Sequence, residues 1–248
     1  HKTTKSSHKK MISEVLNWDE FLDAESTGGC IHEVLRYFLF RNLIRPTLGQ
    51  DLTNKILGEG FHSKLKSSNI FYGYEHISMI RILKNPKSKW LKKYGGKTKL
   101  INDSLEDTFN FISEKIGNKI NDWEWGKIHL ATFPHPLSAK EPFDKVFNNG
   151  PYEIGGSTDT VNQMGTSPTS PFEMKFSAPS VRFIIDLSDF SNSFINVPPG
   201  NSGHLASPNY NDRIGPLISG KYHRMLWNFE DIEEQAVGVL SLKKEGKK

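Results

Sequence analysis

Apolar residues in the first half of the chain recur at the spacing of amphipathic helices. The strongest pattern follows Ser26, where apolar side chains stand three and four positions apart up to Pro46. Ser26 or Thr27 can cap such a helix, and Pro46 is expected to end it because proline lacks an N–H. The same spacing predicts further helices over residues 50–57, 74–83 and 105–116, the last of them closed by Gly117.

Three lysine-rich segments lack this periodicity. Residues 1–10 and 243–248 are expected to be flexible basic ends, and residues 84–99 an exposed connection that Trp90 could anchor. The positive excess in these segments is larger than the net charge of +4, so the rest of the chain is acidic. Nucleic-acid binding through the ends is one interpretation, but such tails are usually solvated, so no nucleic-acid partner is expected.

After Trp123 the pattern changes to that of short strands. Residues 128–133 and 194–197 are apolar and are bounded by turn residues, as strands are. The stretch 148–171 is rich in Gly, Pro, Ser and Thr and exceeds the usual connection of about four to six residues, so it is expected to be functional or mobile. Short helices are expected over 212–218 and after Asn228, and a last strand over 236–242.

The rest of the chain is organised around the segment from Ser180 to Asp189. Its apolar and β-branched run ends in Asp186, and this length and composition predict a buried strand. Because side chains alternate along a strand, Phe183 would face one way and Arg182 and Asp186 the other. Burying a carboxylate is costly unless a donor or cation satisfies it, so Asp186 should have a partner.

These elements predict an α+β chain in four parts. They are a flexible basic start (1–10), a mainly helical part (11–122), a strand-containing part (123–242) and a basic tail (243–248). With 248 residues and 36% hydrophobic content, the chain can bury a core. No apolar run approaches the ~20 residues of a membrane span and no leader is visible, which leaves the compartment open. Cys30 is the single cysteine, so internal disulfides and multi-cysteine metal sites are excluded.

Six motifs occur in a characteristic order along the second half. They are FNNGP from Phe147, GGSTDTVN from Gly155, SVRFIIDLSD from Ser180, PGNSGH from Pro199, SPNY from Ser207, and Tyr222-His223. The segment from Leu16 to Asp19 and the stretch from Trp125 to Leu137 belong to the same pattern. Over residues 15–225 the chain therefore resembles the C-terminal part of the β chain of the penicillin acylase family, which includes acyl-homoserine lactone acylases and cephalosporin acylases.

The resemblance implies an N-terminal-nucleophile hydrolase with a four-layer αββα fold. In such enzymes a precursor cleaves itself, and the new N-terminal serine attacks an amide with its own α-amine as base. The implied reaction is hydrolysis of a small-molecule amide, such as a β-lactam side chain or an N-acyl homoserine lactone, through an acyl-enzyme. This chain begins with His1 and has no nucleophile segment near its start, so the nucleophile and the oxyanion-hole residues are expected outside it.

The partners implied are the α chain and the N-terminal half of the β chain of the same precursor. The chain alone is expected to be inactive, and apolar faces meant for those partners would be exposed and prone to self-association. The alternative is a catalytically silent binding or scaffold module of acylase ancestry. An upstream Ser, Thr or Cys that opens a strand, followed by a histidine, would separate the two interpretations.

Asp186 is the one catalytic-site residue that the resemblance implies for this chain. In several branches of the family, a carboxylate on the matching strand orients a histidine that follows the nucleophile. The simpler interpretation is that Asp186 accepts hydrogen bonds at a strand end. Arg182 is not a suitable direct partner, because four residues of strand span ~13 Å.

Asp159 and Asn162 are candidates for a place near the site. They lie in the glycine-containing loop, where Gly155 and Gly156 allow positive φ angles and close backbone approach. Their simpler role is to stabilise the loop through Asx-type turns. Ser157 stands where many relatives carry an acidic residue, which weakens a charge-dependent role.

No metal or other cofactor is assigned to this chain, and the calcium of relatives is expected at upstream positions. His129 and His135 would share one face of a continuous strand and could bind a metal, but Pro134 and Pro136 interrupt that strand. A Ser-His-Asp triad would need a Gly-x-Ser-x-Gly elbow, which the sequence lacks. His204 and His223 are expected to be turn or packing residues.

Overall fold

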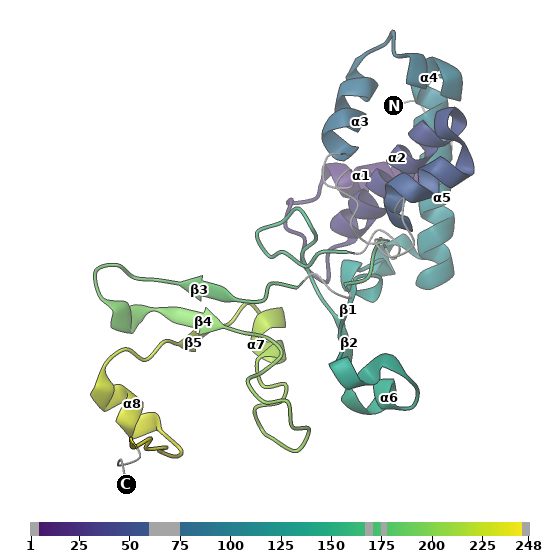
Figure 1. The fold of residues 1–248 in the computed structure, drawn as a ribbon. Coiled ribbons are helices and arrows are strands. Elements are labelled where there is room, and N and C mark those ends of the chain that lie inside the picture. Colours follow the sequence, from purple (N-terminus) through teal and green to yellow (C-terminus); the bar gives the residue numbers. More distant parts are fainter. Residues whose placement is uncertain (1–4, 60–74, 167–170, 175–177, 245–248) are drawn as a thin grey trace. The chain divides into compact units, whose positions relative to one another are not determined.

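The computed structural model describes residues 5–59, 75–166, 171–174 and 178–244 (Figure 1). The chain divides into two compact units, residues 1–178 and residues 179–248. The described residues combine helices with two small antiparallel sheets, which confirms the α+β class. No described helix has the length and apolar character that crossing a membrane requires.

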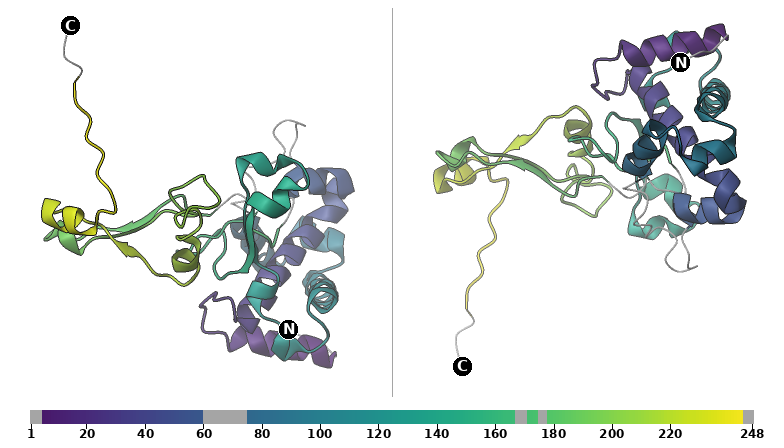
Figure 2. Two further views of the ribbon diagram at one scale, coloured as in Figure 1. Left: turned by 90° about the horizontal axis from the view of Figure 1, so that it is seen from below. Right: turned by 90° about the horizontal axis from the view of Figure 1, so that it is seen from above.

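The first unit is built on helix α2. The helices of this unit are α1 (Ser6–Leu16), α2 (Thr27–Asn54), α3 (Glu75–Lys84), α4 (Lys89–Tyr94), α5 (Lys97–Lys115) and α6 (Phe143–Phe147). Helix α2 packs against both α1 and α5, which also contact each other, and Figures 1 and 2 show the three together. The core cluster around these helices consists of Met11, Leu22, Cys30, Ile31, Val34, Phe38, Leu105, Ile112, Ile120, Trp123, Trp125, Ile128 and Phe172.

The start of α2 agrees with the sequence, but its end does not. Ser26 caps the helix, because its Oγ accepts a hydrogen bond from the Gly29 N–H at 3.0 Å. Pro46 lies inside α2, so the predicted stop was wrong. The interruption falls instead at Gly49, whose φ of 75° is accessible mainly to glycine, and the chain is helical again up to a π-helical turn, Lys55–Glu59.

Two lysine-rich segments are helical where the sequence predicted irregular chain. Helix α1 begins at Ser6 because His8 and Met11 are buried against α2 and α5, which anchors the basic start. Helix α4 lies within the predicted connection, where Leu91 is buried and Gly95 ends the helix with a φ of 101°. Trp90 packs against a second cluster, as expected of an anchor; its buried members are Phe40, Leu43, Ile44, Leu57, Met79, Leu91 and Leu100.

A short hairpin-like sheet completes the first unit. Strand β1 (Leu130–Phe133) pairs antiparallel with β2 (Asn149–Glu153), so the predicted first strand is confirmed and the long loop begins only after Glu153. The Met174 N–H donates to the Leu130 carbonyl at 2.8 Å and adds a bridge on the other side of β1. The 3₁₀ turns of this unit are Ile120–Asp122, Trp125–Lys127 and Pro136–Ala139.

The second unit contains a three-stranded antiparallel sheet in the order β3-β4-β5. Its strands are β3 (Arg182–Ile184), β4 (Phe194–Asn196) and β5 (His223–Arg224), with a 3₁₀ turn, Phe190–Asn192, between the first two and helices α7 (Ile214–Ile218) and α8 (Phe229–Gln235). The predicted strand near 194–197 and both predicted short helices are confirmed.

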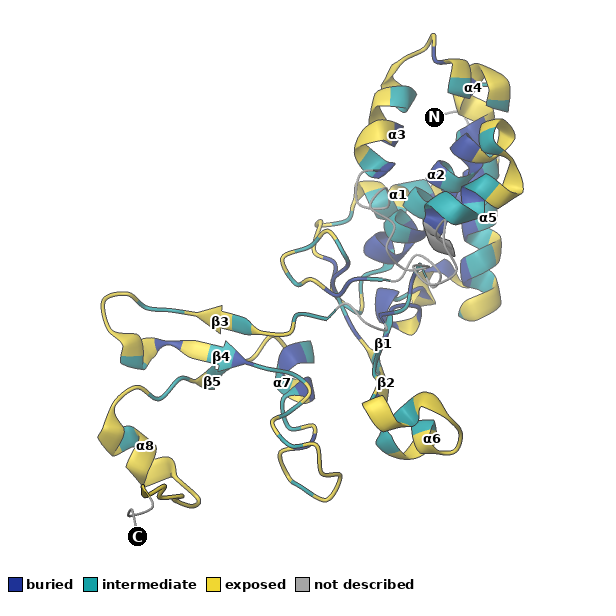
Figure 3. Ribbon diagram, in the orientation of Figure 1, coloured by how far each residue is buried: buried dark blue, intermediate teal, exposed yellow. Residues whose placement is uncertain are grey.

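Strand β3, which belongs to the segment that the sequence predicted to be a buried strand, is not buried. Phe183 is 60% exposed and Ile184 53% exposed, and Figure 3 shows much of β3 in the colour of exposed residues. Among the described residues of this unit, no second layer covers both faces of β3. The predicted last strand over 236–242 is also wrong, because Val237 and Leu240 lie in a fully exposed segment that runs away from the sheet (Figure 2).

Candidate functional site

The glycine-containing loop is tied to the core of the first unit by Trp125. The indole N–H of Trp125 donates to the Gly156 carbonyl at 2.8 Å, and the Gly156 N–H donates to the Leu22 carbonyl at 2.6 Å. Gly156 has a φ of 80°, and a Cβ at this position would lie 2.0 Å from the Asn162 carbonyl oxygen. The pair of glycines therefore allows the close backbone approach that the sequence predicted.

Ser157 and Thr160 form the turn within this loop. The Thr160 Oγ accepts from the Ser157 N–H at 2.8 Å and donates to the Asn162 carbonyl at 2.8 Å. The Asp159 N–H donates to the Ser157 Oγ at 3.3 Å. The side chains that close the turn are hydroxyls, whereas the sequence predicted Asx-type turns from Asp159 and Asn162.

The Asp159 carboxylate instead joins an ionic cluster on α2. Arg36 donates from Nη1 to Asp159 at 2.9 Å and from Nη2 to Glu33 at 2.8 Å. His32 Nδ1 lies 3.0 Å from the other carboxylate oxygen of Glu33. Burial raises the pKa of Glu33, but the His32 hydrogen bond and the Arg36 charge outweigh it, so the pKa ends below its usual value.

Glu75, at the start of α3, faces the same cluster, but its pKa is shifted in the opposite direction from that of Glu33. The residue is buried, and in the part of the chain that the structure describes its Oε2 has no hydrogen-bond partner. Burial raises the pKa of Glu75 to about 7; Asp159 and Glu33 add to the rise and Arg36 opposes it. Near neutral pH, Glu33 is therefore ionised, whereas Glu75 is partly protonated.

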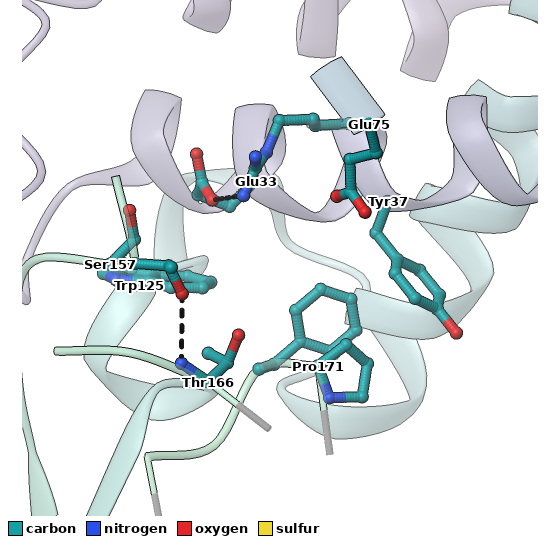
Figure 4. A pocket seen from close by; sticks show the side chains of 10 residues that line it. Glu33, Tyr37, Glu75, Trp125, Ser157, Thr166 and Pro171 are labelled. Carbon is teal, nitrogen blue, oxygen red and sulfur yellow. Dashed lines mark hydrogen bonds and ion pairs between the residues drawn. The ribbon is translucent and has the colours of Figure 1, made fainter. Parts of the chain in front are cut away.

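Figure 4 shows how these groups surround a small cavity. Glu33, Tyr37 and Glu75 face it from the helices, and Ser157 and Thr166 face it from the loop. The free space is about 10 Å³, which is room for one water molecule but not for an organic substrate. The arrangement can hold the loop in place and exchange a proton with a single water, and it is a positioning cluster rather than a substrate pocket.

Asp186 belongs to the second unit and lies just after β3. Its Oδ1 accepts hydrogen bonds from the Ser188 N–H at 2.9 Å, the Ser188 hydroxyl at 2.6 Å and the Asp189 N–H at 3.3 Å. These bonds hold the pKa of Asp186 below its usual value, and the bond from the Ser188 hydroxyl has the largest effect. Asp186 is therefore ionised at neutral pH and orientated by its own turn.

The candidate histidines occupy separate structural positions. His129 is buried, stacks on Trp125 with ring centroids 4.6 Å apart, and its Nδ1 lies 2.7 Å from the Phe172 carbonyl oxygen. His135 caps a 3₁₀ turn and stacks on Phe147, and His204 accepts from the Ala206 N–H in a turn. Among the described residues, no group of three or more His, Cys, Asp and Glu side chains could hold a metal ion.

The sequence missed Arg36, Glu33 and Glu75. The available signal was the i,i+3 spacing of Glu33 and Arg36 beside the apolar stripe of α2, a pair that the helix holds at ion-pair distance. The pairing of Arg36 with Asp159 spans 123 positions, and no local pattern reports it. Glu75 stands at a helix start, where an acidic residue has an ordinary explanation in the helix dipole.

Comparison with known proteins gives consistent results for sequence and structure. The family model described as Penicillin amidase matches residues 2–234. The penicillin acylase 2 proenzyme of Pseudomonas sp. (strain SE83) is 37% identical over 230 residues, which are 92% of this chain and 28% of that protein. The acyl-homoserine lactone acylase QuiP of Pseudomonas aeruginosa is 27% identical over 233 residues, which are 88% of this chain and 27% of that protein.

The fold also matches a solved structure. The thermostable penicillin G acylase from Alcaligenes faecalis aligns with all of this chain and 44% of its own, with a TM-score of 0.54 and 13% identity. This chain spans little more than a quarter of the length of the curated relatives above.

Proposed function

The chain belongs to the penicillin amidase family, and on that premise we propose that it is the C-terminal part of a larger amide hydrolase. The observation that carries the proposal is the alignment with a penicillin acylase proenzyme, at 37% identity over 92% of this chain and 28% of that protein. The substrate is a small-molecule amide, of the class of β-lactam side chains or N-acyl homoserine lactones. The nucleophilic serine and the oxyanion hole are supplied by polypeptide outside this chain, and the acyl group passes through an ester of that serine.

In this reaction Asp186 orients a histidine of another segment. The carboxylate is ionised and one of its oxygens is fixed by Ser188 and Asp189, so it can accept an imidazole N–H in a defined direction. The histidine is thereby held in one tautomer beside the nucleophile. Asp186 acts through that histidine and does not touch the substrate, so it is a positioning residue.

Asp159 and Asn162 support the site from the glycine-containing loop. The Arg36–Asp159 ion pair fixes the loop on α2, while Trp125 holds its glycine pair. A loop with this many anchors can present its backbone to a neighbouring segment at a constant distance. The cavity beneath the loop has room for one water only, so the loop does not bind the substrate there. Its contribution to catalysis is to maintain the shape of the site.

The exposed apolar residues of the second unit are the contact surface for the rest of the protein. Phe183, Ile184 and Phe194 lie on the sheet and are each at least 41% exposed. Burial of a large apolar side chain contributes about 1.5–3 kcal/mol, so covering these three gives a substantial driving force for assembly. The α chain and the remainder of the β chain are the proposed partners, and self-association is expected when they are absent.

Mass spectrometry of the native protein tests this assembly. A preparation purified through this sequence should contain other polypeptides from the same reading frame, and either one of them or the polypeptide that carries this sequence should begin with Ser, Thr or Cys. A preparation that contains this chain alone, and remains monomeric, would instead support a catalytically silent module.

Kinetics of the assembled protein test the role of Asp186. Asp186→Asn keeps an oxygen that can accept the turn hydrogen bonds but loses the charge, so kcat should fall at least about tenfold while KM and the melting temperature change little. Asp189→Asn is the matched control, since the Asp189 side chain makes a similar turn contact with the Ser191 N–H at 2.9 Å, and Asp189 contacts Asp186 only through its backbone N–H, which the variant keeps. Equal kcat values for the two variants would reject the positioning role.

A further inference from the structure

Four aromatic rings form a closed circuit on one side of α2. Tyr37 contacts Phe38 and Phe172 with ring centroids 5.3 and 5.2 Å apart. Phe111, from α5, contacts Phe38 at 5.9 Å and Phe172 at 4.8 Å. These separations lie in the range of favourable aromatic pairs, so the rings make a rigid apolar surface that joins α2, α5 and the segment 171–174.

A cavity of about 480 Å³ opens above this surface. That volume falls within the usual range of small-molecule sites. The four rings line it together with aliphatic side chains, and its charged residues are Arg41, Lys115, Lys127 and Glu173. An aromatic floor with mostly cationic groups around it is a site for a molecule with an apolar body and a negative charge.

Arg41 is the cation best placed to hold that charge. Its guanidinium carbon lies 5.8 Å from the centre of the Phe38 ring, so the group sits directly at the aromatic surface. Within the part of the chain that the structure describes, no carboxylate lies within ion-pair distance of Arg41 or Lys115, whereas Lys127 is paired with Glu124 at 3.0 Å. The planar fork of a guanidinium matches the two oxygens of a carboxylate.

We propose that this cavity binds an amphipathic carboxylate, an aryl or medium-chain acyl acid, with its apolar body on the four rings and its carboxylate on Arg41. A quaternary ammonium, the other common guest of aromatic enclosures, is disfavoured because Arg41 and Lys115 would repel it. The acids that amide hydrolysis releases belong to the same chemical class. That link to the reaction rests on the proposed function, but the binding itself does not.

The binding can be tested directly on the 248-residue chain. Ligand-observed NMR and calorimetry should detect binding of 4-phenylbutyrate, and its uncharged amide, 4-phenylbutyramide, should bind at least about tenfold more weakly because it cannot pair with Arg41. Equal affinity of the acid and the amide, or no binding of either, would overturn the proposal. Because no hydrolysis is measured, the outcome is independent of whether the proposed function is correct.

Variants assign the site within the chain. Arg41→Gln should weaken phenylbutyrate binding at least about tenfold, and Arg41→Lys should retain part of it. Arg81→Gln is the matched control, because Arg81 is an exposed arginine on α3 that does not line this cavity. Phe111→Leu should weaken the acid and the amide by similar factors, since it removes the shared aromatic contact. Unchanged binding in folded Arg41→Gln, judged by circular dichroism, would refute the assignment.

Discussion

Arg36 on helix α2 donates a hydrogen bond to Asp159 at 2.9 Å and so joins the central helix to a loop 123 positions later. The Arg36 side chain is 18% exposed, and it also neutralises Glu33, whose side chain is 10% exposed. The pair therefore fixes the glycine-containing loop and satisfies a buried carboxylate at the same time.

Removing Arg36 should cost more stability than removing Asp159. Arg36→Met leaves the buried Glu33 carboxylate without its cation and should lower the free energy of unfolding by about 3 kcal/mol. Asp159→Asn removes only the more exposed partner and should cost about 1 kcal/mol or less. Urea denaturation measures both, with Arg81→Met as the control for loss of an exposed arginine. Equal losses of unfolding free energy for Arg36→Met and Asp159→Asn would contradict the role of Arg36 as the cation shared by Glu33 and Asp159.

Glu75 should make stability decrease as the pH rises. Its pKa is about 7 in the folded chain, above the ordinary value of 4.5, so the folded state holds this proton more tightly than the unfolded state. The stabilisation is complete below about pH 4.5 and is lost as the pH rises through about 7, with a total of about 3 kcal/mol. Glu75→Gln should remove this loss, so the variant should be about as stable as the parent at pH 4.5 and more stable at pH 8.

His129 should have the opposite effect on stability. Burial lowers the pKa of His129 to about 4 from the ordinary 6.5, so the unfolded state takes up the proton first as the pH falls. The corresponding stabilisation is present above about pH 6.5 and is lost as the pH falls through about 4. His129→Phe keeps a ring that can stack on Trp125 but loses the hydrogen bond to Phe172, so it should be less stable at pH 7 and show a smaller further loss at pH 4.

The two effects cover nearly the same pH range with opposite sign. In the parent chain they should largely cancel, and each single variant should expose the slope of the group that remains. Denaturation curves at several pH values between 4 and 8 measure this directly. If Glu75→Gln and His129→Phe shift the pH dependence in the same direction, the assigned protonation states are wrong.

Gly156 should tolerate no side chain. An added Cβ would lie 2.0 Å from the Asn162 carbonyl oxygen, at a φ of +80°. Gly49 has nearly the same φ, +75°, but nothing lies within 4 Å of a Cβ there, so Gly49→Ala measures backbone strain alone, of order 1–3 kcal/mol. Gly156→Ala should cost at least about 2 kcal/mol more. Similar melting temperatures for the two variants would show that the loop can move away from the core.

Local signals in the sequence were sufficient for most helices of the fold. Ser26 was predicted correctly as a cap, because capping depends on neighbouring residues. The helix start after Asn228 was also predicted, although the Asn228 side chain makes no capping hydrogen bond. Pro46 was misjudged, because it lies inside α2 just after the buried Leu43 and Ile44, and the helix is interrupted only at Gly49. The break at Gly49 follows from its φ, which the sequence does not reveal.

The candidate site was harder to predict, for a physical reason. The apolar run around Phe183 indicates burial, but what would bury it is not among the described residues of its unit, and the strand is exposed. Arg36, Glu75 and Asp159 come from three distant segments, and their juxtaposition depends on tertiary packing. The family motifs located the glycine-containing loop and Asp186, while the ionic cluster beneath the loop required coordinates.

Amide hydrolysis by the protein from the complete reading frame, compared with residues 1–248 alone, tests the central claim most directly. Release of the free acid from a chromogenic acyl amide should occur with the complete protein after processing, and residues 1–248 alone should show none above the uncatalysed rate. Hydrolysis by residues 1–248 at the rate of the complete protein would contradict the account, as would a fully processed complete protein that hydrolyses neither β-lactam side-chain amides nor N-acyl homoserine lactones.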